Sequence, residues 1–225
     1  MTLTSGRGPL SPDPAGRFTP AIPTPTVYVE PHPRRIQAVI GGRTVLETEH
    51  VLLVHRPGAP LSYAFVEDEV GGLPHQAVPE APGFVQVPWD SVDEWYEEGR
   101  LLVHYPPNPF HRVDCRPTRR RLRVTVGGTT LVDTDDTVIL YETALAPKLY
   151  VSPDQVRTEL LRPSQTTTYC NYKGWTTYLD AVVGDTVFED VAWRYDSPLP
   201  ESTQIAGMLS FEPTHAGVEA ELPTT

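Results

Sequence analysis

The sequence predicts an all-β protein with minor helix, arranged as two small domains in tandem. Its 225 residues include 25 prolines and 16 glycines, a composition that favours short strands and turns over long helices. Apolar and other residues alternate on both sides of Gly41-Gly42 and of Gly127-Gly128, as expected for hairpins whose turns need positive φ. The two patterns lie 86 residues apart within similar flanking sequences, which indicates an internal repeat.

The repeat sets the expected domain boundaries. The first 27 residues are rich in proline and poor in apolar groups, so we expect a disordered or draped tail. A shortened first domain and its connection should span residues 28–116, and a complete second domain residues 117–225. The boundary is expected near Cys115–Thr118, because prolines gather there just before the second hairpin.

The second copy contains about 38 residues that the first copy lacks. They fall between Arg157 and Ala206, so any chemistry in that segment is expected once per chain. The first domain would then supply scaffold or one wall of a site.

Elsewhere, a short helical turn is expected at Ser152–Gln155, and another near Asp90. Strands are expected at Val138–Tyr141, Thr176–Val183 and Thr186–Phe188, with a Gly184-Asp185 turn between the last two.

Composition argues against several classes of function. The 29 acidic and 18 basic residues give a net charge of −11, which disfavours nucleic acids and anionic membranes as partners. Two cysteines cannot form a disulfide framework or a zinc knuckle, and a reducing cytoplasm suits them. No apolar run suits a bilayer span, and the opening residues do not resemble a signal peptide. We therefore expect a cytoplasmic protein without a membrane partner.

Two further groups of residues could suggest functional sites, but each has a simpler structural interpretation. The seven histidines show no metal-ligand spacing, so we expect neither a metal nor a cofactor. A basic island lies in and after the expected boundary and comprises Arg116, Arg119, Arg120, Arg121 and Arg123. Because no aromatic platform or nucleic-acid motif accompanies it, we expect a solvated linker and an outward strand face.

The densest cluster of functional side chains is Tyr169-Cys170-Asn171-Tyr172-Lys173-Gly174. Asn-Tyr-Lys-Gly is typical turn chemistry, and such a turn could bring Cys170 and Lys173 together. The ammonium would then favour a thiolate nucleophile, whereas burial would act oppositely on both groups. The structural alternative is a buried thiol beside a lysine that closes the turn by a salt bridge. Downstream, Trp193 and Tyr195 share one side of an extended segment and would wall a pocket or fill the core.

These residues carry a resemblance to a bacterial family called domain of unknown function 427. Its hallmark is a Cys-Pro-Tyr-Lys-Gly stretch, which appears here as Cys170–Gly174 with Asn171 in place of proline. The resemblance runs from Arg121 to Leu222 and includes the stretches 160–164, 189–195 and 205–207. Residues 95–114 look like the connection of two-copy actinobacterial members, which implies that the first domain is a shortened family domain.

The resemblance implies a strongly bent sheet, related to the β-tent or Mss4-like architecture, with the motif next to a groove. Zinc-binding relatives of that fold use paired cysteine knuckles, which this chain lacks. The family also carries a nucleotidyltransferase-like label, but the sequence has no phosphate loop or paired metal-binding acids to support that chemistry.

We therefore expect one small-molecule site in the second domain, with a ligand that the sequence does not identify. Its candidate residues are Tyr169, Cys170, Tyr172, Lys173, Trp193 and Tyr195, with Lys173 meeting an anionic or carbonyl group. Cys170 and Lys173 are the candidate catalytic residues, although whether the protein is an enzyme stays open. The alternative is a noncatalytic module that binds a protein partner, in which the motif only stabilises a turn.

Overall fold

The computed structural model describes residues 3–4, 6–23 and 25–223 and divides the chain into two compact units, Met1–His111 and Arg112–Thr225. The predicted tail therefore includes four positions outside the described residues (1, 2, 5 and 24), and the predicted second domain includes two (224 and 225). The described secondary structure consists of β-strands and short 3-10 turns, which confirms the all-β class. Residues 115–118, the expected boundary, lie inside the first strand of the second unit.

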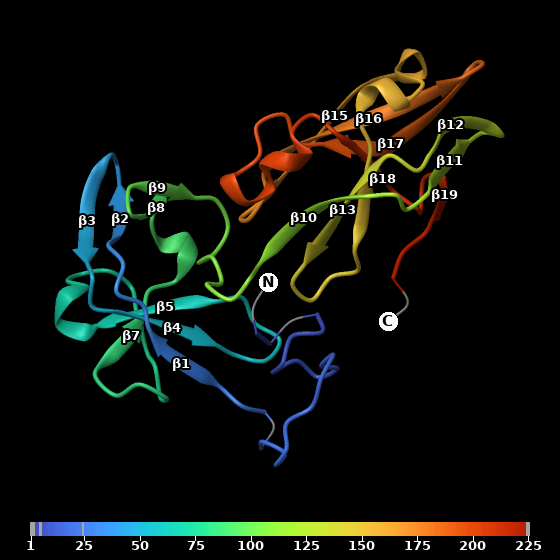
Figure 1. Cartoon of the computed structure of the whole chain (residues 1–225). Helices are drawn as coiled ribbons and strands as arrows, with labels where there is room; N and C mark the ends of the chain where they lie inside the picture. Colours follow the sequence, from blue (N-terminus) through green and yellow to red (C-terminus); the bar gives the residue numbers. More distant parts are fainter. Residues whose placement is uncertain (1–2, 5, 24, 224–225) are drawn as a thin grey trace. The chain divides into compact units, whose positions relative to one another are not determined.

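The first unit contains two antiparallel sheets (Figure 1). Its strands are β1 (Tyr28–Pro31), β2 (Ile36–Ile40), β3 (Arg43–Thr48), β4 (Val51–His55), β5 (Ser62–Val66), β6 (Gln76–Ala77), β7 (Phe84–Gln86), β8 (Glu94–Glu97) and β9 (Arg100–Leu102). They form the orders β1-β4-β5-β7-β6 and β3-β2-β8-β9. The 3-10 turns η1 (Glu67–Glu69) and η2 (Trp89–Ser91) connect them. The second turn includes Asp90, where the sequence predicts a short helical piece.

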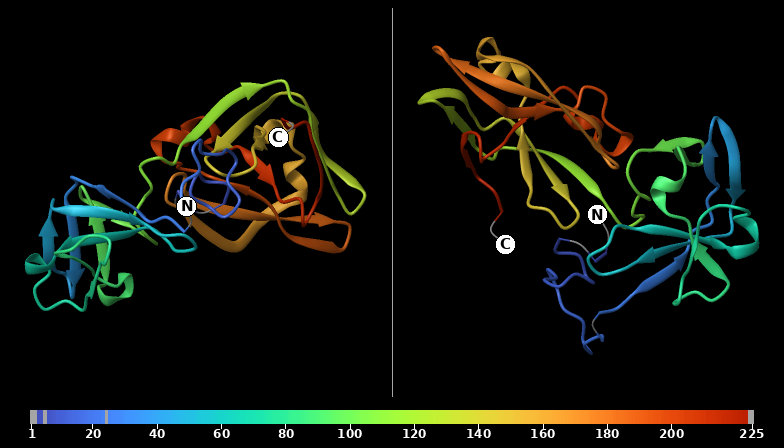
Figure 2. Two further views of the ribbon diagram at one scale, coloured as in Figure 1. Left: turned by 90° about the horizontal axis from the view of Figure 1, so that it is seen from below. Right: turned by 180° about the vertical axis from the view of Figure 1, so that it is seen from behind.

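The second unit contains three antiparallel sheets. Its strands are β10 (Val113–Thr118), β11 (Leu122–Val126), β12 (Thr129–Thr134), β13 (Thr137–Glu142), β14 (Lys148–Tyr150), β15 (Leu161–Cys170), β16 (Gly174–Val183), β17 (Thr186–Arg194), β18 (Leu209–Phe211) and β19 (Gly217–Ala220). The orders are β10-β13-β14, β12-β11-β19 and β15-β16-β17-β18. Figure 2 shows the long strands β15, β16 and β17 (orange) side by side.

Strand pairing repeats with the same 86-residue spacing as the sequence. Val29 faces Val54 between β1 and β4, and Cys115 faces Leu140 between β10 and β13. Both Gly-Gly hairpins form as predicted, with positive φ at all four glycines. Each hairpin also has a register shift at the same place, after Ala38 in the first and after Val124 in the second. The shared geometry extends to the next pair, because β4–β5 and β13–β14 have corresponding registers.

The segment that only the second copy contains, between Arg157 and Ala206, holds the long strands β15, β16 and β17. The predicted strands and the Gly184-Asp185 turn between them are present. The expected short helical turn is present, with Ser152 at the N-cap position and Pro153 in the first turn. It consists of the 3-10 turn η3 (Pro153–Gln155), followed by η4 (Thr158–Leu160), and the Ser152 side chain makes no capping hydrogen bond. The 3-10 turn η5 (Pro200–Ile205) precedes β18.

Each unit has its own core. In the first unit, Phe65, Tyr63 and Trp95 lie in one buried cluster. In the second, one cluster surrounds Val124, and another includes Tyr150, Tyr195 and Ile205. The described residues before Tyr28 form turns and bends without a strand, with local bonds such as Leu10 N to Leu3 O at 2.9 Å. Within the described chain, no helix has both the length and the hydropathy needed to cross a membrane.

Candidate functional site

The family motif forms the turn between β15 and β16. Cys170 and Gly174 face each other across the hairpin, and Lys173 N donates to Cys170 O at 3.3 Å. Gly174 has φ +93°, a conformation that residues with a side chain rarely adopt. Leu199 N donates to Lys173 O at 3.0 Å, so the chain after β17 holds the turn from outside. The predicted turn therefore exists and is fixed by a contact distant in sequence.

Lys173 forms an ion pair with Glu142, the last residue of β13. The two side chains are only 9% and 7% exposed. Burial lowers the pKa of Lys173, but Glu142, Cys170 and Tyr195 together outweigh burial and raise that pKa. Lys173 is therefore a permanent buried cation rather than a neutral amine nucleophile.

A cavity of about 380 Å³ opens beside this ion pair. Both lysines of the chain, Lys148 and Lys173, line it, and so do Trp193 and Tyr195. The Lys148 ammonium lies 5.5 Å from the centre of the Trp193 ring, and the Lys173 ammonium lies 5.9 Å from the centre of the Tyr195 ring. These separations suit cation–π attraction. The cavity thus combines two cations and two carboxylates, Glu142 and Glu212, with aromatic walls.

Trp193 is held in place by Tyr150. The indole Nε1 donates to the Tyr150 hydroxyl at 3.1 Å, and the two rings meet edge to face at 6.4 Å. Burial raises the pKa of Tyr150 well above its ordinary value, and burial also raises the pKa of Tyr195 despite the opposing effect of Lys173. Both phenols are therefore neutral at pH 7, and neither can serve as a ready base.

The structure places the six predicted site residues in two groups. Lys173, Trp193 and Tyr195 line the cavity. Cys170 and Tyr172 pack against the apolar cluster that includes Tyr150 and Tyr195 but do not line the cavity. Tyr169 meets the exposed Trp175 edge to face at 5.1 Å. Three of the six thus share the cavity, and the candidate nucleophile does not line it.

Among the lining residues missed in the sequence, five carry polar side chains, namely Glu142, Lys148, Tyr150, Tyr178 and Glu212. Lys148 could have been noticed in the sequence, because the chain has only two lysines and Lys173 was already a candidate. Glu142 carried no such signal, since its importance depends on a partner 31 residues away. Tyr150 looks like an ordinary strand residue until its hydroxyl is seen to accept the Trp193 hydrogen bond.

A second polar cluster fixes the path of β17. Asp190 has φ +51°, and its carboxylate accepts hydrogen bonds from Ser164 at 2.6 Å and Thr166 at 2.7 Å. Its backbone N–H donates to Asp180 Oδ1 at 3.0 Å, close to the register shift between β16 and β17. Strained backbone of this kind persists when surrounding contacts determine it. The cluster therefore supports the strand that carries Trp193.

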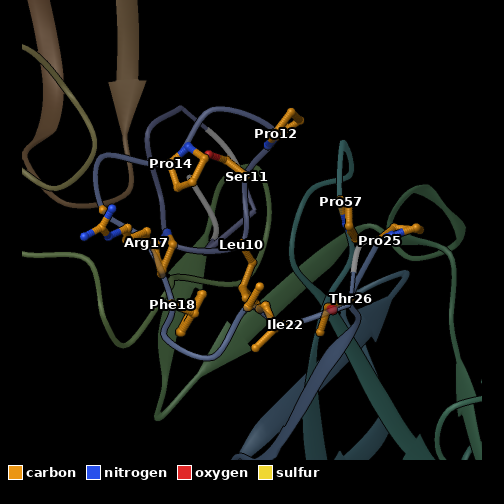
Figure 3. Close-up of a pocket in the computed structure, with 13 residues that line it drawn as sticks. Leu10, Ser11, Pro12, Pro14, Arg17, Phe18, Ile22, Pro25, Thr26 and Pro57 are labelled. Atoms are coloured by element: carbon orange, nitrogen blue, oxygen red, sulfur yellow. The ribbon is translucent and has the colours of Figure 1, made fainter.

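The remaining sequence features have simpler structural roles in the described residues. Arginines of the basic island pair with Asp114, Asp133 and Asp135 on the surface of the second unit. No group of three His, Cys, Asp or Glu side chains in the described chain is placed to hold a metal. A cavity of about 560 Å³ lies within the N-terminal segment (Figure 3). Prolines and the apolar residues Leu10, Phe18 and Ile22 surround it, with Arg17 as the single charged lining residue described.

Comparison with known proteins supports the resemblance in the second unit. No curated protein matches the chain. The family described as NTP_transf_9, a domain of unknown function (DUF427), matches residues 114–222. That segment contains the motif turn, the Lys173–Glu142 pair and all the described residues that line the lysine cavity. The second unit of this chain accordingly matches the DUF427 family model over nearly its whole length.

Proposed function

We propose that the second unit binds a small organic anion with a planar body in the lysine cavity. The observation that carries this proposal is the placement of the only two lysines of the chain on the walls of one cavity. The other 16 basic residues are arginines, so lysine is not a routine surface residue in this sequence. A lysine ammonium is a compact charge that meets carboxylate or phosphate oxygens without a fixed geometry.

The charges of the cavity assign different roles to the two lysines. Glu142 neutralises Lys173, whereas Lys148 forms no ion pair with any described residue. The Glu212 carboxylate accepts hydrogen bonds from the backbone and hydroxyl groups of Thr214. Glu142 and Glu212 match the two lysines in number, so preference for an anion depends on Lys148, the lining cation without an ion pair to a described residue. An anionic ligand group would meet Lys148, and Lys173 would donate a hydrogen bond to the same group or to a carbonyl.

The aromatic side chains suit the body of the ligand. Trp193 is fixed by Tyr150, and Tyr195 is buried, so both rings are already in place before a ligand arrives. A preformed wall reduces the entropy lost on binding. A cavity of about 380 Å³ is also of the size that small-molecule sites commonly have.

This proposal concerns binding and assigns no reaction. Cys170 does not line the cavity, and Lys173 stays charged, so the candidate catalytic pair lacks an open position beside the ligand. We further propose that the first unit is a shortened family domain, that both units have a β-tent-like architecture, and that the protein works in the cytoplasm. The repeated strand registers and the two free cysteines support these three proposals.

A pair of probes with the same ring and opposite charges tests the site. We expect the full chain to bind benzoate and to ignore benzylamine in a calorimetric or NMR titration. Lys148→Gln should weaken benzoate binding by about tenfold, because one charged hydrogen bond is lost. Arg119→Gln removes the same charge from an exposed position and should change nothing. Equal binding of both probes, or indifference to Lys148→Gln, would reject the anion site.

The alternative is a protein-interaction module in which the motif is structural. One observation favours it, since Lys173 and the turn around it make most of their polar contacts inside the protein. In that case Lys148→Gln should leave every small-molecule titration unchanged, whereas loss of Lys173 should reduce folding stability alone. The two proposals therefore differ in what Lys148 does.

A further inference from the structure

The first unit has a cavity of its own beside the loop that corresponds to the one at the lysine cavity, but it opens on the opposite face of the strands. Tyr63 and Phe65 line it, and their counterparts Leu149 and Val151 lie in the core cluster around Val124. The first-unit cavity measures about 410 Å³ and lies beside the loop that joins β4 to β5, while the lysine cavity lies beside the loop that joins β13 to β14. Four pairs of lining positions correspond at the 86-residue spacing, namely Arg56 and Glu142, Ala59 and Leu145, Pro60 and Ala146, and Ser62 and Lys148. The shortened first unit therefore has a cavity beside this loop although it lacks the long strands.

The charges of the two cavities differ at these equivalent positions. Ser62 replaces Lys148, so the first cavity has no counterpart of the unpaired ammonium. Arg56 is neutralised, because its guanidinium donates to Glu80 at 2.9 Å. Asp90 also lines this cavity, is exposed, and makes no ion pair with a described residue. The uncompensated charge beside the first cavity is therefore negative.

Aromatic rings form most of the remaining wall. Phe65, Trp95 and Trp89 make a continuous stack, with ring centres 5.7 Å and 5.4 Å apart. Phe65 and Trp95 are fully buried, whereas Trp89 keeps exposed surface. Trp95 Nε1 donates to Trp89 O at 3.0 Å and so fixes the end of the stack. Tyr105 adds another ring to the lining.

We propose that this first-unit cavity binds a small organic cation of the substituted ammonium class. The ring faces of tryptophan and tyrosine attract ammonium groups through their quadrupoles, and tryptophan is the most effective. A carboxylate at the edge of such a wall adds charge complementarity, which Asp90 supplies next to Trp89. The chain would then carry two sites, one in each unit, that select ligands of opposite charge. This inference goes beyond the proposed function and does not depend on it.

Choline and its uncharged isostere 3,3-dimethylbutan-1-ol test the inference with the full chain. Both have the same shape, so only the charge differs. Tryptophan fluorescence or calorimetry should show saturable choline binding that is about tenfold tighter than that of the isostere, the difference expected for one desolvated cation–π contact. Equal affinity for the two probes, or no saturable choline binding, would overturn the proposal.

Substitutions in the cavity wall test whether choline binds at this cavity. Asp90→Asn should weaken choline binding several-fold, and Trp89→Leu should abolish it while circular dichroism verifies that the chain is folded. Asp68→Asn is the matched control, because Asp68 is an exposed acid in another 3-10 turn of the same unit and does not line the cavity. If the Trp89→Leu protein does not fold, the effect of Asp90→Asn on choline binding still tests the proposal. Choline binding that survives Asp90→Asn unchanged would place the cation elsewhere and overturn the inference.

Discussion

The Lys173 ammonium pairs with the Glu142 carboxylate where both side chains are almost fully buried. Two charges removed from water in this way are costly individually, and each depends on the other for compensation. The pair joins the motif turn to the end of β13, two segments that the sequence separates by 31 residues. The lysine of the family motif therefore has a structural partner as well as a place in the cavity wall.

Breaking this pair should destabilise the protein strongly. Lys173→Met leaves the Glu142 carboxylate buried and unpaired, and we expect a loss of about 3 to 5 kcal/mol in the free energy of unfolding. Urea denaturation followed by fluorescence measures the loss. The double variant with Glu142→Leu removes both charges and should recover most of it. A Lys173→Met protein as stable as the surface control Arg119→Gln would show that no such pair forms.

A buried carboxylate in the first unit predicts a distinct acid sensitivity. Burial raises the pKa of Glu97, but hydrogen bonds from His32, Tyr63 and Arg34 outweigh burial and lower that pKa from 4.5 to about 2. A depressed pKa stabilises the fold above pH 4.5, and this contribution is lost as the pH falls towards 2. Its size is about 3 kcal/mol.

Glu97→Gln isolates this effect. The variant lacks the titrating group, so its stability should fall less steeply than that of the unmodified protein between pH 4.5 and pH 2. It should also be less stable at pH 7, because His32, Tyr63 and Arg34 lose their charged acceptor. Chemical denaturation at a series of pH values gives both slopes. Parallel curves would mean that Glu97 titrates normally in the folded state.

The two cysteines should react at different rates with an alkylating reagent. Cys115 is buried, and burial raises the pKa of its thiol, whereas Cys170 is partly exposed. Only the thiolate reacts, so we expect iodoacetamide at pH 8 to modify Cys170 at least about tenfold faster than Cys115. Peptide mass spectrometry measures both rates in one sample. If Cys170 also reacted faster than a free model thiol at neutral pH, the nucleophile hypothesis would regain support.

The motif glycine should resist substitution because of its backbone conformation. A Cβ at Gly174 would have its nearest neighbour at an ordinary 3.5 Å, so the cost comes from φ +93° and not from a clash. We expect Gly174→Ala to lower the free energy of unfolding by about 1 to 2 kcal/mol. Gly72→Ala is the control, since Gly72 has open space and no positive φ. Equal stability of the two variants would refute the strained turn.

Local sequence signals predicted much of the fold. The Gly-Gly hairpins, the Gly184-Asp185 turn and the motif turn all depend on residues adjacent in the chain, and each is present. The residue pattern correctly placed strands at Thr176–Val183 and Thr186–Phe188, within the segment that only the second copy has. The 3-10 turn at Pro153 was harder to predict, because the same cap-like sequence suits one helical turn or several.

The candidate site was only partly predictable, because a cavity depends on contacts between distant segments. Trp193, Tyr195 and Lys173 stood out as unusual residues, and they do line the lysine cavity. Glu142 and Tyr150 gave no signal, since each acquires its role from a partner on another strand. The cavity of the first unit was missed for a related reason, as its wall of Trp89 and Trp95 has no counterpart in the second copy of the repeat.

The most direct test of the central claim is a native mass spectrum of the full chain, purified gently from the lysate of its own host. A small acidic molecule that travels with the folded protein, and is released on unfolding, is the predicted result. Lys148→Gln should lose this added mass, and Arg119→Gln should keep it. A molecule that is retained equally by both variants would contradict the assignment of the lysine cavity as its binding site.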